Sequence, residues 1–168
     1  MAACERLPPN APFPDESFDA VLLFAVLTCL PADDDQRAVI NELHRLTRPG
    51  GLLYVSDYWL QTDERNQERY AQFEAPHHEA RGTEEVVGKT PPISPSSSRQ
   101  PPPSPYGVFE VSGGVTVRHH SRQWIDSLLY QWEPLAASDI QVTTMNGHEA
   151  AGFQWLGRKE NSERRNGI

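Results

Sequence analysis

Hydrophobic and polar positions change period along the chain, and the changes predict alternating strands and helices. Residues 18–24 (FDAVLLF) form a continuous apolar run, typical of a strand buried on both faces of a parallel sheet. Three aspartates at 33–35 suit a helix start, and apolar residues recur at helical spacing over 39–46. Proline and glycine at 48–51 end that helix, and the apolar run at 52–56 predicts another strand. This order makes one βαβ unit of an α/β domain.

The C-terminal third carries a second set of elements. Residues 107–111 and 115–119 flank a Ser-Gly-Gly loop and predict a β-hairpin. Ser121 suits the N-cap of a following helix, because its hydroxyl can accept from a backbone N–H of the first turn. Residues 140–144 and 152–156 predict two further strands, joined through an Asn-Gly turn.

Between these two halves lies a segment of different composition. Residues 75–105 hold eight of the 15 prolines together with a cluster of serines and few large apolar residues. Ordering such a segment costs backbone entropy with little burial in return, so we expect a disordered insertion. Arg99, Pro102 and Pro105 have the spacing of a polyproline-II ligand for a PxxP-binding partner.

Charge and cysteine content narrow the class of protein. The formal net charge is −8, with 23 acidic against 15 basic residues, which argues against bulk nucleic-acid binding, though not against a small RNA substrate. The longest apolar run, 20–30, is too short to span a bilayer, and the N-terminus has no signal pattern. Two cysteines provide no disulfide framework or four-cysteine metal site. We therefore expect a soluble cytoplasmic protein with no membrane partner.

The βαβ unit also has a recognisable pattern. PFPDESFD at 12–19, AVLL at 20–23 and LHRLTRPGGLLYVSD at 43–57 closely resemble the second half of class I S-adenosylmethionine-dependent methyltransferases of the type 11 kind. The match covers the family's fourth strand, the next helix and the R-P-G-G turn into the fifth strand. The resemblance implies the C-terminal half of a Rossmann-like sheet, with parallel strands and closing antiparallel strands.

The resemblance also implies how the chain is divided. A partial methyltransferase domain over 12–74 contains the fourth strand, helix, fifth strand and following helix. The Pro/Ser-rich insertion at 75–105 interrupts it. Residues 106–158 supply the hairpin, helix and closing strands of the same domain, and 159–168 form a flexible tail.

The implied activity is S-adenosylmethionine-dependent methyl transfer to a small-molecule acceptor that the sequence does not identify. By resemblance, Phe24, Ala25 and Val26 line the methionine end of the cofactor, at the carboxyl end of the first strand. Asp57, at the end of the next strand, and His119 are the candidate catalytic bases, with His120 as a substitute for His119. Alternatively, Asp57 is a helix cap or a solvated acid. The alternative for the histidines is a ring that is hydrogen-bonded within the fold or exposed to solvent.

Geometry limits what the two histidines can do. Adjacent residues on a strand point to opposite faces, so His119 and His120 cannot enter one pocket, and we expect no metal site. Tyr58, Trp59, Phe109 and Trp124 are candidates for the wall of an acceptor pocket or, alternatively, for the core.

Two family elements have no counterpart in this sequence. No G-x-G loop lies upstream of residues 18–24, and Leu7 stands where the family commonly has an acid near the adenine. The family places its first strand beside the fourth, so without it 18–24 becomes an exposed apolar edge strand. We therefore expect the C-terminal part of a methyltransferase that binds the cofactor weakly or not at all. The alternative is a non-catalytic remnant or adaptor that acts through a partner chain or its proline-rich arm.

Overall fold

A computed structural model describes residues 11–81, 106–111, 113–144 and 147–160, with the backbone alone for 74–81. The elements run in this order: β1 (Phe18–Phe24), the 3-10 turn η1 (Leu27–Cys29), α1 (Asp33–Leu46), β2 (Thr47–Tyr58), α2 (Glu64–Arg81), β3 (Val108–Val111), β4 (Val115–Arg118), α3 (Arg122–Leu128), β5 (Trp132–Thr143) and β6 (Glu149–Lys159).

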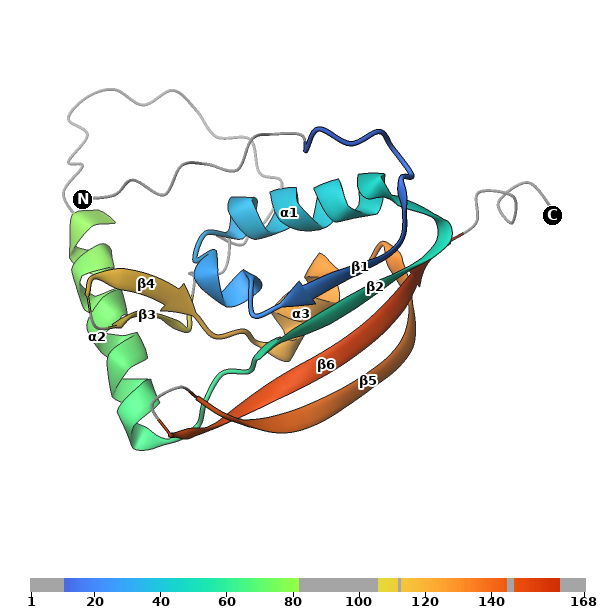
Figure 1. Ribbon diagram of the computed structural model, residues 1–168. Helices are drawn as coiled ribbons and strands as arrows, with labels where there is room; N and C mark the ends of the chain where they lie inside the picture. The colour runs from blue at the N-terminus through green and yellow to red at the C-terminus, as the bar shows by residue number, and fades with distance from the viewer. Residues whose placement is uncertain (1–10, 82–105, 112, 145–146, 161–168) are drawn as a thin grey trace, which may run out of the picture.

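The described strands form one four-stranded sheet and one separate hairpin (Figure 1). The sheet has the order β1-β2-β6-β5, with β1 parallel to β2 and the other neighbours antiparallel. Strands β3 and β4 form the antiparallel hairpin. Parallel strands closed by an antiparallel pair confirm the expected Rossmann-like α/β arrangement.

The βαβ unit forms as its sequence pattern predicts. Three aspartates open α1, where carboxylates interact favourably with the helix dipole. At the other end, the Lys159 ammonium donates to the backbone carbonyls of His44 and Thr47, both at 2.8 Å. A cation is favoured at a helix C-terminus, so the last residue of β6 secures the turn from α1 into β2.

One face of the sheet carries the hydrophobic core. Helices α1 and α3 pack there with Leu23 of β1 and with buried residues of β2 and β6 (Figure 1). Ser121 is the N-cap of α3, and its hydroxyl accepts from the Trp124 N–H at 3.1 Å, as predicted. The buried core cluster consists of Leu23, Leu27, Ile40, Leu53, Val55, Trp124, Ile125, Leu128, Leu129, Trp132 and Phe153.

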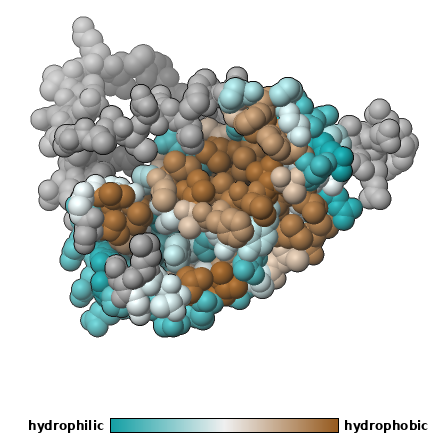
Figure 2. Space-filling model, viewed as in Figure 1, coloured by the Kyte–Doolittle hydropathy of each residue, from teal (hydrophilic) through white to brown (hydrophobic). Residues whose placement is uncertain are grey.

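The expectation that residues 18–24 are buried on both faces is wrong. Leu23 is buried, but Leu22 is 63% and Phe24 is 60% exposed. Strand β1 lies at the edge of the sheet, and none of the described segments covers the face that carries these two side chains. A hydrophobic patch is visible over β1 in Figure 2. The exposed apolar edge that the sequence predicted is therefore confirmed.

Other boundaries differ from the sequence-based ones. Helix α2 continues to Arg81, so its last turns occupy the first residues of the range assigned to the Pro/Ser-rich insertion. Only one of the eight prolines of 75–105 falls within that helix, and the rest begin at residue 91. Strands β5 and β6 are 12 and 11 residues long, more than predicted, because they pair along their whole length.

Some predicted segments lie beyond the part of the chain that the structure describes. These are 82–105, with the PxxP-like residues Arg99, Pro102 and Pro105, and the tail from 161 to 168. Within the described residues, no helix has the length and apolar character needed to cross a membrane.

Truncation of a side chain on the buried face of β1 should destabilise the fold much more than truncation on the open face. Leu23→Ala should lower the free energy of unfolding by about 2–4 kcal/mol, because it leaves a cavity in the core. Leu22→Ala should change it by less than about 0.5 kcal/mol, because the side chain already contacts solvent. Urea denaturation of both variants checks this. Equal losses would mean that the open face of β1 is covered in solution.

Candidate functional site

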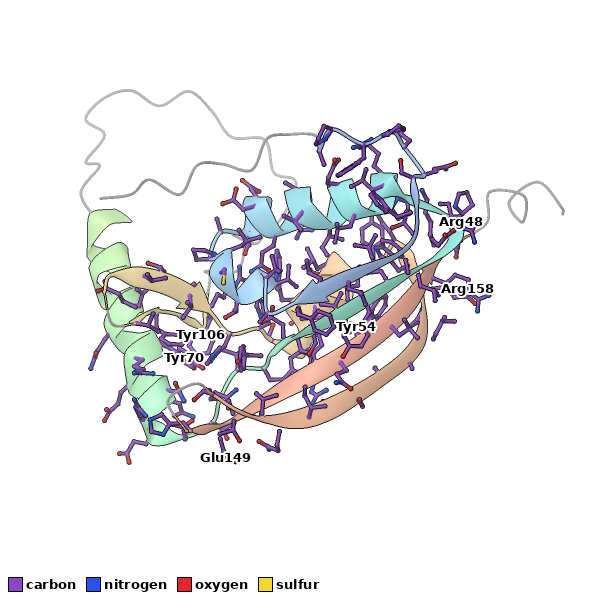
Figure 3. The ribbon with its side chains drawn as sticks, in the orientation of Figure 1. Arg48, Tyr54, Tyr70, Tyr106, Glu149 and Arg158 are labelled. Carbon is purple, nitrogen blue, oxygen red and sulfur yellow. The ribbon has the colours of Figure 1, made fainter. Side chains whose placement is uncertain are left out.

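The chain turns sharply at the carboxyl end of β1. Ala25 has φ +49°, in the left-handed region that side-chain-bearing residues rarely adopt. Its N–H still donates to the Ser56 carbonyl of β2 at 2.8 Å, which holds the turn against the sheet. Phe24 points to the open face, with its ring centroid 5.1 Å from that of Tyr54, which lies on β2 in Figure 3. The backbone of Ala25 and Val26 thus forms a fixed projection beyond the strand.

Asp57 supports the segment that follows this turn. Its carboxylate accepts from the Thr28 N–H at 3.1 Å and from the Tyr58 N–H at 2.8 Å, and the residue is only 5% exposed. Burial raises the pKa of Asp57 to about 6, while the hydrogen bonds from Tyr58, Thr28 and Leu27 act in the opposite direction. Asp57 therefore caps η1 from the neighbouring strand. This arrangement corresponds to the helix-cap alternative from the sequence.

His119 lies in an aromatic cluster between α2 and the hairpin. The Tyr70 hydroxyl accepts from the Gln61 N–H at 3.2 Å and lies 2.6 Å from His119 Nδ1. If Tyr70 donates its own proton to Nδ1, this network assigns the imidazole proton to Nε2. Burial lowers the pKa of His119 to about 4, so the ring is neutral at pH 7. Tyr70 and Tyr106 lie together at this cluster (Figure 3).

His120 points into a different part of the molecule. Its Nε2 lies 2.9 Å from Gln36 Nε2, and its Nδ1 lies 3.3 Å from the Tyr58 carbonyl and 3.8 Å from the Asp57 carboxylate. An amide NH₂ only donates, so Nε2 accepts and Nδ1 carries the proton. Burial lowers the pKa of His120 to about 3. The two adjacent rings therefore occupy separate surroundings, as strand geometry predicts. No group of three or more metal-ligating side chains occurs in the described ranges.

Comparison with known proteins identifies the fold. Residues 3–55 match the methyltransferase domain family. A SAM-dependent methyltransferase from Methanosarcina mazei superposes with a TM-score of 0.68 at 20% identity, over 92% of this chain and 65% of that one. The chain has the fold of a class I methyltransferase.

Further relatives support this methyltransferase fold. The 1,6-didemethyltoxoflavin-N1-methyltransferase of Burkholderia thailandensis, solved with S-adenosylhomocysteine bound, gives a TM-score of 0.52 at 13% identity over 92% of this chain and 49% of that chain. The tRNA N(3)-cytidine methyltransferase METTL2 of Gallus gallus is 45% identical over 47 residues, 28% of this chain. The chain spans only 12% of that relative's length.

The four aromatic residues that were candidates for the wall of an acceptor pocket lie in different places: some are in the core, and one borders a pocket. Phe109 and Trp124 are buried, as their alternative as core residues predicted. Trp59 instead stacks on Phe153, with ring centroids 4.2 Å apart, and borders a pocket of about 290 Å³ between α3 and β5–β6. The Arg122 guanidinium lies 4.6 Å from the Trp59 ring centroid. Tyr58 is half-buried beside His119, with ring centroids 5.5 Å apart.

Sequence reasoning missed two residues of this region, Gln36 and Tyr70. Both are almost fully buried, at 0% and 1% exposure. Gln36 carries a signal in the sequence, because it continues the buried stripe of α1 that contains Ile40, and a polar residue in an apolar stripe needs a buried partner. Tyr70 gives no comparable signal, because α2 has little amphipathic character.

The buried titratable groups predict how the stability of this fold depends on pH. The pKa values of His119 and His120 are lower in the folded protein than in the unfolded chain, so their stabilising contribution is complete above about pH 6.5 and is lost on acidification. The lowered pKa of His44 acts in the same direction. The raised pKa of Asp57 opposes this loss, because the folded state takes up a proton near pH 6.

Asp57→Asn should therefore steepen the acid destabilisation. Between about pH 6 and 4.5, the slope of unfolding free energy against pH should increase by about 1.4 kcal/mol per pH unit, which corresponds to one proton. Urea denaturation at a series of pH values measures the slope. Asp126→Asn, on the exposed side of α3, is the matched control. An unchanged slope in Asp57→Asn would show that Asp57 titrates as an ordinary exposed carboxyl.

Proposed function

We propose that the protein takes part in S-adenosylmethionine-dependent methyl transfer, with the backbone of Phe24–Val26 in contact with the methionine end of the cofactor. The observation that carries the proposal is the left-handed turn at Ala25, held against β2 at the carboxyl end of β1. Ligands of open α/β sheets bind beyond the carboxyl ends of the strands. The class I methyltransferase fold and the S-adenosylhomocysteine bound to the Burkholderia thailandensis protein support this choice of cofactor.

The cofactor, when bound, supplies a methyl group on a sulfonium for in-line displacement by an acceptor, a step that depends mainly on proximity and alignment. In this proposal Asp57 and His119 position the site rather than act as bases. The Asp57 oxygens accept backbone N–H groups, and His119 Nδ1 is engaged with the Tyr70 hydroxyl at 2.6 Å. The proposed acceptor is a small molecule that needs no side-chain base at the moment of transfer.

Substitutions at Ala25 test the proposed contact. Ala25→Gly should keep the turn, because glycine adopts positive φ without a steric penalty, whereas Ala25→Val should displace it, because a β-branched residue does not. We expect weak binding of S-adenosylhomocysteine by the wild-type chain, seen as NMR shifts at 24–28 on titration. The same shifts should appear with Ala25→Gly and fall at least tenfold with Ala25→Val.

Two results would contradict the cofactor contact. One is a folded wild-type chain that shows no shift at 24–28 in millimolar S-adenosylhomocysteine. The other is an Ala25→Val variant that binds as the wild type does. The amide signals of β5 and β6 serve as the internal control. Strand β5 is the opposite edge of the sheet from β1, and β6 lies beside it.

A second candidate function is that of a non-catalytic subunit that pairs with a partner chain. The exposed apolar side chains Leu22 and Phe24 on edge strand β1 favour it. The proline-rich arm, with Arg99, Pro102 and Pro105, is the alternative partner site in this proposal.

Pull-down experiments separate these partner sites. If β1 binds the partner, Leu22→Lys should abolish capture, because a charge replaces the contact, while deletion of 82–105 should leave it intact. If the arm binds the partner, the reverse pattern is expected. Capture that survives both changes together would exclude this second function.

A further inference from the structure

Gln36 joins four separate parts of the fold through one buried amide. Its Oε1 accepts from the Trp124 indole N–H of α3 at 2.6 Å. Because an indole nitrogen only donates, this bond fixes the orientation of the amide. The Nε2 group then shares its two protons among three acceptors: the Leu30 carbonyl at 2.7 Å, the Leu27 carbonyl at 3.0 Å and His120 Nε2 at 2.9 Å.

The segment that receives these bonds is too short to hold its own shape. Turn η1 has three residues, and its N-cap position, Val26, offers no side-chain hydrogen bond. Isolated 3-10 turns of this length make few internal bonds. In η1, the Cys29 N–H donates to the Val26 carbonyl at 2.9 Å, and the Leu30 N–H donates to the Leu27 carbonyl at 3.0 Å. The position of η1 must therefore depend on groups outside the turn.

Leu27 packs into the core, and two side chains provide hydrogen bonds at opposite ends of the turn. Asp57 of β2 accepts from the N–H end, at Thr28, and Gln36 of α1 donates to the carbonyl end, at Leu27 and Leu30. The same stretch of β2 receives the Ala25 N–H through the Ser56 carbonyl. The strained turn and η1 are thus fixed to one strand on one side and to one helix on the other.

We propose that Gln36 and Asp57 are positioning residues that clamp η1 from its two ends and so fix the backbone of Ala25 and Val26. The link to cofactor binding rests on the function proposed above, but the clamp itself does not. A purely structural glutamine would contribute stability to the whole fold. A clamp instead controls the local opening of η1, so its loss should change hydrogen exchange at η1 more than hydrogen exchange in the sheet.

Hydrogen exchange on the full 168-residue chain distinguishes local from global effects. Gln36→Leu keeps a similar shape and removes both the donor and the acceptor. We expect the amides of 28–30 to exchange at least tenfold faster, while the paired amides of β5 and β6 change less than threefold. Gln131→Leu is the matched control, because Gln131 is a half-buried glutamine outside the clamp whose side-chain amide donates to Asn41 Oδ1 at 2.9 Å in a solvent-exposed hydrogen bond.

A second variant addresses the possibility that Gln36→Leu fails to fold. Gln36→Glu keeps an acceptor for the Trp124 indole but has no NH₂ to donate to the carbonyls of Leu27 and Leu30. The indole NMR signal of Trp124 should therefore stay near its wild-type position while exchange at 28–30 increases. Asp57→Asn should raise exchange at Thr28, because its amide can offer only one oxygen to the two backbone N–H groups.

The outcomes separate the clamp from the proposed function. Uniformly faster exchange across β2, β5 and β6, or unchanged exchange at 28–30, would overturn the clamp. If the wild type shows no S-adenosylhomocysteine shifts but Gln36→Leu opens η1 locally, the cofactor proposal fails and the clamp stands. If both hold, Gln36→Leu should also weaken the cofactor-induced shifts at 24–28 at least tenfold, while Gln131→Leu leaves them unchanged.

Discussion

The hydrogen-bonded pairing of β2 on both of its edges is the constraint on which the rest of the fold depends. On one edge β2 pairs in parallel with β1, and on the other it pairs antiparallel with β6. Side chains on one face of β2 must therefore fit under α1 and α3, and Leu53 and Val55 do so with full burial. Asp57 belongs to the same alternating set, two residues beyond Val55. The strand that builds the core thus also delivers a carboxylate to the end of β1.

Burial of that carboxylate is unfavourable unless neighbouring groups satisfy it. An unpaired buried polar group costs about 1–3 kcal/mol, and more when it is charged. Hydrogen bonds from backbone N–H groups satisfy the Asp57 carboxylate. Hydrogen bonds from the Trp124 indole and to two backbone carbonyls satisfy the Gln36 amide. The two histidines remain neutral near pH 7, because both pKa values are lowered by burial. The polar interior is consequently held together by directional bonds that an apolar core would not provide.

The sequence was sufficient to predict the local helices and strands, but it was insufficient to predict which other parts of the chain surround them. The run at 18–24, the aspartates of 33–35 and the cap Ser121 depend on neighbours along the chain, and each lies in the element that it predicted. Burial of β1 depends instead on which strands and helices lie beside it, so its apolar composition alone was misleading. The capping role of Asp57 was foreseen only as an alternative, since the turn it caps lies 29 residues away. Gln36 meets His120 across 84 residues, which no local pattern reveals.

Phe24 connects the two functions proposed for this chain. It is the last residue of β1 on the open apolar face, and it directly precedes the left-handed turn at Ala25. A partner strand or helix on that face would contact Phe24 and Leu22 together, because side chains two apart share one face of a strand. Such a partner would therefore lie against the residue that directly precedes the turn at Ala25, and the segment after that turn is held by hydrogen bonds from Gln36 and to Asp57.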